Sequence, residues 1–423
     1  MRWTRRRAIA AGGTLIAAGA AAWTWPEQGF VNPCLGGLPG ATAVRALLRD
    51  AYEGVDAARL LDAHVHVFGT GDGGDRDVAF DGGRGSLRWP IGALQRTVLA
   101  NAACAPERAF DAGYVERLVA LAEAMPPGAR CLLLALDAWH DAAGRADPAR
   151  THLRVGNDFV ARVAARAPGR FLWAASVHPA RVDALAELER VRRGGAVAVK
   201  WIPSAQGIDP ASPACDAYYQ ALAGARLPLI THAGTQRAAP GDDALGNPLR
   251  LRRPLEHGVT VVVAHCASMG ASPDLDRGAG GPAVPNFALF ERLMDEPAHA
   301  GRLWGDLSAL TQSARAGAPL ARVLERGVEG GDWAGRLVNG SDYPLPAILP
   351  LTSPRALADD GWLDPALVEP LRALRGHDAL SFDFALKRHL RIGGRRLAAA
   401  IFEGARLFAT TGDSMSSPSM ASR

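Results

Sequence analysis

Residues 59–70 read RLLDAHVHVFGT, a short apolar run with two histidines near its end. In an extended strand alternate side chains face the same side, so His64 and His66 point one way. Two neutral imidazoles on a rigid strand suit one divalent metal ion, because each ring has a nitrogen lone pair to donate. Two histidines at this spacing also arise by chance as ordinary hydrogen-bonded groups. The pair therefore predicts a metal site only if further ligands follow downstream.

Seven further apolar runs of strand length follow, and stretches of amphipathic helical pattern separate them. The eight predicted strands are 60–68, 131–136, 171–177, 196–201, 227–231, 259–264, 303–307 and 336–339. Parallel strands need crossover helices and are buried on both faces, which fits this alternation. Eight such units favour a closed (β/α)8 barrel of the α/β class, the TIM-barrel fold, over a doubly wound open sheet.

Length and composition favour a single barrel domain with additions at both ends. The chain has 423 residues, 48% of them hydrophobic and 21% charged, which is ordinary for a globular protein. Long loops leave the C-terminal ends of strands at 69–111, 268–285 and 344–376, and we expect lids or specificity loops there. We predict an export signal or membrane anchor at 1–25, a linker and covering helix at 26–59, the metal-dependent barrel at 60–408 and a disordered tail at 409–423.

The N-terminal residues have the pattern of an export signal. Three arginines, Arg5–Arg7, precede an uncharged run rich in alanine and glycine at 8–25, and Pro26 ends it. Paired arginines before such a run are typical of the twin-arginine route. We therefore expect an exported protein, periplasmic or attached to the outer face of the cytoplasmic membrane. The run is near the lower length limit of a membrane span, so a cleaved signal peptide and a tether through residues 8–25 both stay open.

Charge and cysteine content narrow the classes of partner. The formal net charge of +4 arises from the arginines of residues 1–25, a stretch without an acid. Nothing in the remaining balance favours nucleic acid, so we expect a small-molecule substrate, and the oligomeric state stays open. The five cysteines include no CxxC pair, which argues against a zinc knuckle. An exported enzyme could carry one or two disulfides, for example Cys34 or Cys104 with Cys215.

Polar residues stand at the ends of five predicted strands. They are His64 and His66, Lys200 in AVAVKWIP, His232 in LPLITHAGT, His265 in VTVVVAHCAS and Asp342 in LVNGSDYP. The carboxyl ends of barrel strands meet at one rim, so these six side chains should converge on the barrel axis. Each alone has a structural explanation, as a half-buried histidine, a snorkelling lysine or a helix-capping aspartate. Six in phase on one face predict a metal centre.

This ordered set resembles the amidohydrolase superfamily of metal-dependent barrel hydrolases. It is most similar to the amidohydrolase-related (amidohydrolase 2) branch, which also includes decarboxylases of unsaturated or aromatic acids. The resemblance implies that His64, His66 and Asp342 bind one metal ion. It implies that His232 binds the same ion or a second one. His265 would bind that second ion or lie beside the attacking water.

Lys200 distinguishes two versions of the centre that this resemblance allows. In a binuclear site the lysine would be carboxylated and would bridge two ions, whereas in a mononuclear site it would contact a substrate oxygen. In both versions a divalent ion, most simply Zn²⁺, would bring the pKa of bound water towards neutrality. Asp342 would take the proton of that water and pass it to the leaving group. His265 or Lys200, with the metal, would stabilise the oxyanion.

Three further residues are candidates for substrate contacts. His140 and His178 end the second and third predicted strands, in LDAWH and SVHP. Structural roles for these two histidines are an equal alternative. Arg237 lies shortly after His232 and could clamp an anion, since guanidinium binds carboxylate in a bidentate manner. The alternative for Arg237 is a solvated loop arginine.

The sequence therefore predicts a metal-dependent hydrolase that cleaves an amide, ester or lactone bond of a small molecule. The alternative is a metal-dependent decarboxylase of a small organic acid on the same scaffold. The third hypothesis is a metal- or ligand-binding protein without turnover. The hydrolase and the decarboxylase hypotheses differ in the state of Lys200 and in the need for a residue that anchors a substrate carboxylate.

Overall fold

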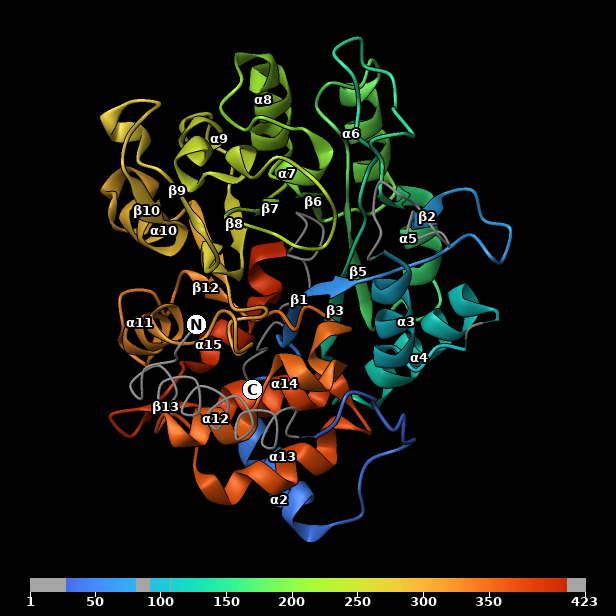
Figure 1. Cartoon of the computed structure of the whole chain (residues 1–423), viewed down its shortest axis with the longest axis vertical. Coiled ribbons are helices and arrows are strands. Elements are labelled where there is room, and N and C mark those ends of the chain that lie inside the picture. Colours follow the sequence, from blue (N-terminus) through green and yellow to red (C-terminus); the bar gives the residue numbers. More distant parts are fainter. Residues whose placement is uncertain (1–27, 81–91, 107, 409–423) are drawn as a thin grey trace, which may run out of the picture.

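A parallel sheet of eight strands forms the centre of the computed structural model, which describes residues 28–80, 92–106 and 108–408 (Figure 1). The sheet closes on itself through a parallel bridge between Val65 and Tyr343 and a 2.9 Å hydrogen bond from Ala63 N to Asn339 O. The predicted (β/α)8 barrel is therefore confirmed. Around the barrel the strands are β1 (Leu61–His66), β3 (Arg130–Leu134), β5 (Phe171–Ala175), β6 (Ala198–Trp201), β7 (Leu229–His232), β8 (Val261–Ala264), β11 (Leu303–Asp306) and β12 (Leu337–Val338).

All eight predicted strands form, and each is shorter than its predicted range. The apolar runs extend beyond the strand ends, where most side chains are still buried and some backbone groups still pair, as in the 2.8 Å hydrogen bond from Leu136 N to Val155 O. Crossover helices cover the outside of the barrel: α4 (Phe110–Ala124), α5 (Asn157–Ala164), α6 (Ala184–Arg193), α7 (Pro203–Gln206), α8 (Asp216–Ala225), α9 (Arg252–Glu256), α10 (Asn286–Asp295) and α11 (Ala318–Gly327).

Successive side chains along each strand point alternately outward and inward. They therefore belong to two hydrophobic cores, one under the helices and one along the barrel axis. Outward residues such as Val199 and Val263 pack under the helices, and inward residues such as Ala198, Ile230 and Trp304 belong to the core along the barrel axis. Two positions further along a strand, a side chain returns to the same face. Lys200, His232 and Asp306 each lie two residues after one of these inward positions, so all three face the axis at the rim.

A bulge in β1 sets the direction of its two histidines. Asp62 pairs with Cys131 and Val65 with Leu133, so β1 has one more residue than β3 in this interval. Such a bulge shifts the alternation by one position. Val65 thereby joins the outer core, and His64 and His66 on either side of it face the barrel axis.

The N-terminal and C-terminal segments pack together beside the barrel. Figure 1 shows α2 (Thr42–Tyr52) next to α13 (Val368–Arg375) and α14 (Ala379–His389). The rings of Tyr52 and Phe384 stack with centroids 4.6 Å apart, and Arg388 Nε donates to Ala51 O at 2.8 Å. The helix α2 lies within the segment 26–59, for which a linker and covering helix are predicted, and it ends at Tyr52. The remaining helices and strands of this region are α15 (Ala399–Phe402), β13 (Arg391–Ile392) and β14 (Arg395–Arg396).

The three long loops contain secondary structure of their own. After β1, strand β2 (Val78–Phe80) pairs antiparallel with β4 (Leu153–Val155), and α3 (Gly92–Ala102) follows. After β8, strands β9 (Ala271–Pro273) and β10 (Ala283–Pro285) form a ribbon. The loop after β12 contains α12 (Pro354–Asp359) and α13. Their use as lids or specificity loops stays a prediction.

A disulfide between Cys34 and Cys104 ties the entry segment to the end of α3. Asn32 and Asn101 reinforce this junction, because Asn32 N donates to Asn101 Oδ1 at 2.8 Å and Asn101 Nδ2 donates to Asn32 O at 3.1 Å. A bridge to Cys215 is wrong, because that cysteine is free and buried before α8.

The predicted leader at 1–25 and the predicted tail at 409–423 lie outside the described residues. Within the described ranges no helix is long and apolar enough to cross a membrane.

Candidate metal centre and active site

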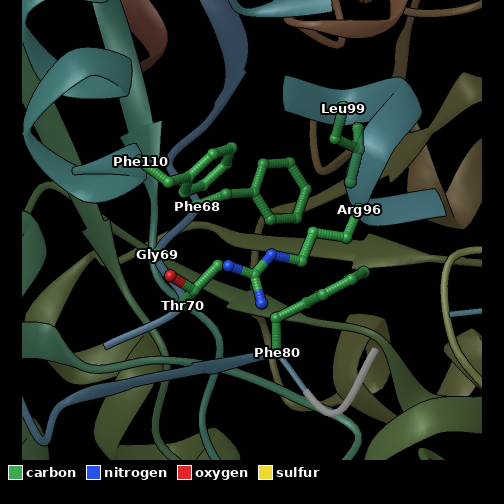
Figure 2. A pocket seen from close by; sticks show the side chains of 7 residues that line it. All are labelled: Phe68, Gly69, Thr70, Phe80, Arg96, Leu99 and Phe110. Carbon is green, nitrogen blue, oxygen red and sulfur yellow. The ribbon is translucent and has the colours of Figure 1, made fainter. Parts of the chain in front are cut away.

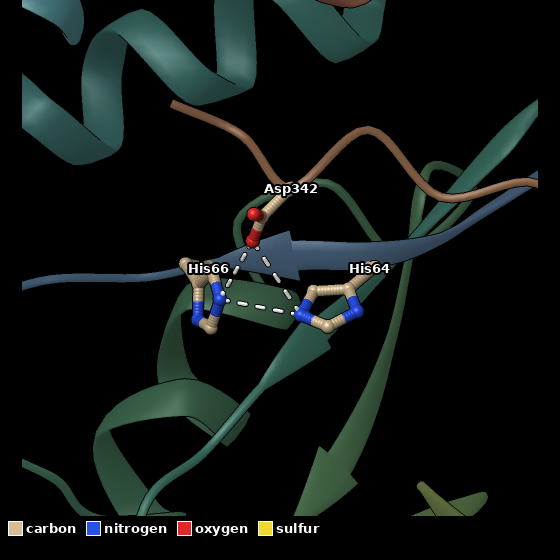
Figure 3. Close-up of side chains that lie close together, drawn as sticks. All are labelled: His64, His66 and Asp342. Carbon is tan, nitrogen blue, oxygen red and sulfur yellow. Dashed lines mark hydrogen bonds and ion pairs between the residues drawn. The ribbon is translucent and has the colours of Figure 1, made fainter. Parts of the chain in front are cut away.

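His64 and His66 at the end of β1 meet Asp342 from the turn after β12 (Figure 3). The Nε2 atoms of the two histidines lie 3.2 Å apart. Asp342 Oδ1 lies 3.1 Å from His66 Nε2 and 3.6 Å from His64 Nε2. Ligand atoms about 2.1 Å from a tetrahedral ion are about 3.4 Å from one another. The three side chains therefore fit one divalent ion, with nitrogen and oxygen donors that Zn²⁺ accepts.

Asp306 fixes the orientation of His64. Its Oδ2 lies 2.5 Å from His64 Nδ1, and both side chains are 1% exposed. The carboxylate accepts the Nδ1 proton, so Nε2 keeps its lone pair towards Asp342. Burial lowers the pKa of His64 to about 4, which favours the neutral ring that a metal needs. Gly340 permits this close arrangement, because a Cβ there would lie 2.5 Å from Asp306 Oδ1 and 2.6 Å from His64 Cβ.

His265 is held so that its second nitrogen faces Asp342. Its Nδ1 lies 3.0 Å from the carbonyl of Ser308 and 2.7 Å from Ser308 Oγ. The carbonyl can only accept, so the proton is on Nδ1 and the lone pair is on Nε2. That Nε2 lies 4.0 Å from Asp342 Oδ2, the oxygen not shared by the two β1 histidines. Ser308 Oγ also donates to Asp306 Oδ2 at 2.7 Å, which joins the two histidines in one network.

His232 lies against His265, with ring centroids 4.9 Å apart. Burial lowers the pKa of both rings well below the ordinary value, and the positive charge of Arg315 lowers it further. Two groups in the described chain bring ligand atoms within 4.8 Å of one another, namely His64–His66–Asp342 and His64–His265–Asp306. The second group is already joined by the short bond between Asp306 and His64, so it fits a hydrogen-bonded network better than an ion. His232 belongs to neither group.

Lys200 lies beside the metal-facing side of His64. Its Nζ is 3.3 Å from His64 Nε2, and the residue is 1% exposed. Burial lowers the pKa of Lys200 to about 8, against the opposing effect of the Asp306 and Asp342 charges. A substantial neutral fraction near pH 8 makes this amine a competent nucleophile or proton carrier.

Asp342 is ionised although it is buried. Burial raises the pKa of its carboxyl, but the hydrogen bond with His66 and the charges of His64, His66 and Arg315 outweigh that effect and hold the pKa below the ordinary value. Its backbone has φ 63°, and that of His265 has φ 56°. Left-handed conformations cost non-glycine residues about 1–2 kcal/mol each. Both residues thus carry backbone strain at the point where they face each other.

The candidate centre is most exposed on the side of His66, where aromatic side chains follow. The His66 side chain is 21% exposed, compared with 1% for His64 and 4% for Asp342. The ring of Phe68 lies 5.6 Å from that of His66. Figure 2 shows the small cavity that follows, about 10 Å³, where Arg96 reaches past Phe80 towards Thr70.

The three secondary candidates lie apart from this centre. None forms a hydrogen bond, ion pair or ring contact with the six rim residues in the described part of the chain. His178 is engaged at both nitrogens, as Nε2 donates to Gln206 O at 2.9 Å and Nδ1 accepts from Ala180 N at 3.1 Å. His140 lines a cleft of about 610 Å³ together with Arg181. Arg237 is exposed on its loop.

Three residues of the centre were not predicted from the sequence. Asp306 had a signal, because LWGD places it in phase with inward Trp304 at the end of a predicted strand. Ser308 and Arg315 had none, since a serine and an arginine in a loop are common. Asp306 is the last residue of β11, and Ser308 and Arg315 follow in the turn and loop after that strand.

Comparisons with known proteins identify the family of this chain. The amidohydrolase family model (Amidohydro_2) matches residues 61–369. Similar solved structures include a probable 2-pyrone-4,6-dicarboxylic acid hydrolase from Acinetobacter baumannii with citric acid bound, with 15% identity, a TM-score of 0.39 and coverage of 68% of this chain and 84% of that one. An uncharacterised TIM-barrel protein from Bordetella bronchiseptica has 15% identity, a TM-score of 0.45 and coverage of 77% and 99%.

A third similar structure is the 5-carboxyvanillate decarboxylase of Sphingomonas paucimobilis, with 13% identity, a TM-score of 0.37 and coverage of 83% of this chain and 99% of that one. No curated protein sequence matches the chain. The family match spans well over half of the sequence. The protein therefore belongs to the amidohydrolase family, whose members are metal-dependent enzymes, either hydrolases or decarboxylases.

Proposed function

We propose that the protein is a metal-dependent hydrolase that cleaves an ester, amide or lactone bond of a small molecule. The main support for the proposal is the position of Asp342, because its two carboxylate oxygens face different side chains. Its Oδ1 lies with the Nε2 atoms of His64 and His66, and its Oδ2 faces His265 Nε2. One carboxylate can thus hold an ion through one oxygen and exchange a proton at the other.

The side chains of the centre have separate tasks in such a hydrolysis. A divalent ion, most simply Zn²⁺, supplies a water molecule of lowered pKa. Asp342 accepts the proton of the attacking water and returns it to the leaving group. His265 Nε2, with its lone pair facing Asp342 Oδ2, orients that water. Lys200, when protonated, donates to the oxygen of the scissile carbonyl as negative charge develops on it.

The ligand geometry supports one ion over two. The described chain has two groups of three ligand atoms that could hold an ion, and a short Asp306–His64 contact already joins the His64–His265–Asp306 group. This leaves His64–His66–Asp342 as the better site, and His232 is outside both groups. Lys200 then acts as a free amine and need not be carboxylated. Two ions per chain together with a bicarbonate requirement would favour the bridging version instead.

We expect the purified protein to bind one Zn²⁺-like ion per chain and to lose all hydrolytic activity when dipicolinic acid removes it. Metal analysis by plasma mass spectrometry and assays on a panel of carboxylate-bearing esters, amides and lactones measure both. His66→Ala should lose the ion, because it removes one of three ligands. His377→Ala, a half-buried histidine that contacts Gly36 O, is the matched control. Full activity in a folded, metal-free protein would contradict the proposal.

A decarboxylase is the second candidate, and the observation that favours it is a buried arginine beside the centre. Arg315 is 7% exposed and has no carboxylate partner in the described residues, as a site for an organic acid requires. Release of ¹³CO2 from labelled aromatic acids, without uptake of ¹⁸O from water into the product, would favour decarboxylation. Uptake of one ¹⁸O per turnover would favour hydrolysis.

We also propose that the protein is exported. The arginine pair before the uncharged run at 8–25 supports this, and so does the Cys34–Cys104 disulfide, because disulfides persist in oxidising compartments. Replacing Arg6 and Arg7 by lysine should retain the protein in the cytoplasm, as shown by cell fractionation. N-terminal sequencing near Ala21 or Trp23 would identify cleavage, whereas an intact Met1 in membranes would identify a tether.

A further inference from the structure

Arg315 is a buried arginine with most of its hydrogen-bonding capacity unused. It lies in the loop after β11, where its backbone N donates to Gln312 O at 2.8 Å. The residue is 7% exposed. Its guanidinium makes one hydrogen bond in the described chain, from Nη1 to Ser268 Oγ at 3.3 Å, and its buried Nε has no partner. A guanidinium has five N–H donors, so several point at no protein acceptor.

Other buried arginines of this protein show what a structural role looks like. Arg375 is 1% exposed and donates to the carbonyls of Pro346, Ile348, Leu349 and Thr352. Arg388 is 2% exposed and donates to the carbonyls of Ala51, Glu53 and Leu397. Each of these side chains is satisfied by backbone oxygens. Arg315 differs from both, so structural support does not account for its burial.

Arg315 lies on the same rim as the metal centre. Its hydrogen-bond partner Ser268 is three residues after His265 in the turn that follows β8. Its positive charge lowers the pKa of His232 and His265, where only burial has a larger effect, and it makes a smaller contribution to the lowered pKa of Asp342. The guanidinium is therefore within electrostatic reach of the two histidines and the carboxylate of the candidate centre.

No acid among the described residues pairs with this charge. Asp306 accepts from His64 and Ser308, and Asp342 is shared by His66 and His64. No carboxylate oxygen lies within 4.0 Å of the Arg315 guanidinium in the described residues. Burying an unpaired cation is costly, so a bound ligand that supplies the counter-charge would account for this arrangement. A divalent ion bound at the centre would add further positive charge beside this guanidinium.

We propose that Arg315 binds a carboxylate of the substrate beside the metal centre, which makes the substrate an organic acid. The proposal rests on the function proposed above only in taking this rim as the reaction site. Guanidinium pairs with carboxylate through two parallel hydrogen bonds, and the unused donors of Arg315 provide them. Arg237, which is exposed on its loop, is not needed as the anchor.

The test compares carboxylate binding to Arg315→Met, Arg237→Met and wild-type protein by isothermal titration calorimetry. The probes are acetate and benzoate, with benzamide as the neutral control, each titrated into metal-loaded and metal-free protein. Loss of a charge-assisted bidentate contact should weaken benzoate binding about 10- to 100-fold in Arg315→Met. Arg237→Met should bind benzoate as wild type does, and benzamide affinity should be the same in all three proteins.

Unchanged benzoate affinity in Arg315→Met would overturn the proposal, and so would wild-type protein that binds neither acetate nor benzoate. If Arg315→Met loses its cooperative unfolding transition, Arg315→Gln and Arg315→Lys carry the same comparison. Glutamine should then weaken benzoate binding more than lysine, which keeps the charge. Metal content is measured on every sample, so that failure of the hydrolase proposal can be distinguished from failure of the Arg315 proposal. Absence of bound metal contradicts the hydrolase, whereas the loss of carboxylate affinity in the variants is measured in either state.

Discussion

Asp342→Asn is expected to lower kcat/KM by about 10³- to 10⁴-fold on the best substrate of the hydrolysis panel. The amide keeps an oxygen of the same size near His66 Nε2, 3.1 Å from Asp342 Oδ1 in the native protein. It cannot accept a proton at neutral pH, so the step assigned to Oδ2 opposite His265 is lost. Steady-state kinetics with simultaneous metal analysis measure the two roles of the carboxylate separately.

The control for Asp342→Asn is Asp243→Asn, which changes an exposed aspartate in the loop after β7. Its activity and metal content should match the wild type. Residual activity of Asp342→Asn within tenfold of the wild type, with metal still bound, would contradict the role of Asp342 as the proton acceptor. Loss of the metal from Asp342→Asn would show instead that Asp342 is needed as a ligand.

Asp306→Asn is expected to weaken metal affinity about 10- to 100-fold and to reduce kcat. The carboxylate accepts from His64 Nδ1 at 2.5 Å and from Ser308 Oγ at 2.7 Å. Its charge increases the basicity of the imidazole and orients Nε2 towards the ion. Asparagine offers a neutral oxygen in the same place, so the ring would be less firmly held and a weaker donor. Competition with a chromogenic chelator measures the dissociation constant.

Asp378→Asn is the matched control, because Asp378 is also a buried aspartate with a serine partner. It is 2% exposed and caps α14 by accepting from Ser381 N at 2.9 Å. Asparagine is an equally good helix cap, so the fold and the metal affinity should be retained. Equal metal affinity in Asp306→Asn and the wild type would show that the Asp306 carboxylate does not support the ligand.

The sequence was sufficient for the elements on which the centre is built. Eight apolar runs separated by amphipathic stretches predicted the eight strands, because parallel strands buried on both faces must be continuously apolar. The positions of Lys200, His232 and Asp342 at strand ends predicted their convergence, since a barrel brings the carboxyl ends of its strands to one rim. These conclusions rest on the local hydrophobic pattern and on the closure of the barrel. Barrel closure is common to any sequence with that pattern.

Other features depend on contacts between distant segments. The disulfide joins Cys34 to Cys104 because the entry segment crosses the end of α3, and cysteine spacing does not record that crossing. His178 lies three residues after the end of β5, and Gln206 from α7 accepts its Nε2 proton, which its place in the sequence does not indicate. The course of the loops determines which side chains meet in this way. That course leaves no periodic pattern in the sequence.

The sequence by itself determined the barrel, its rim and the six polar residues that point to a metal, because strand periodicity and strand order fix which side chains share a face. Only the tertiary structure decided how these residues divide their tasks. The bulge in β1 aims His64 and His66 at Asp342, and the backbone of Gly340 leaves room for Asp306 beside His64. The loop after β11 buries the unpaired guanidinium of Arg315 on the same rim. Hydrogen bonding and burial, which depend on packing across the whole chain, set each role.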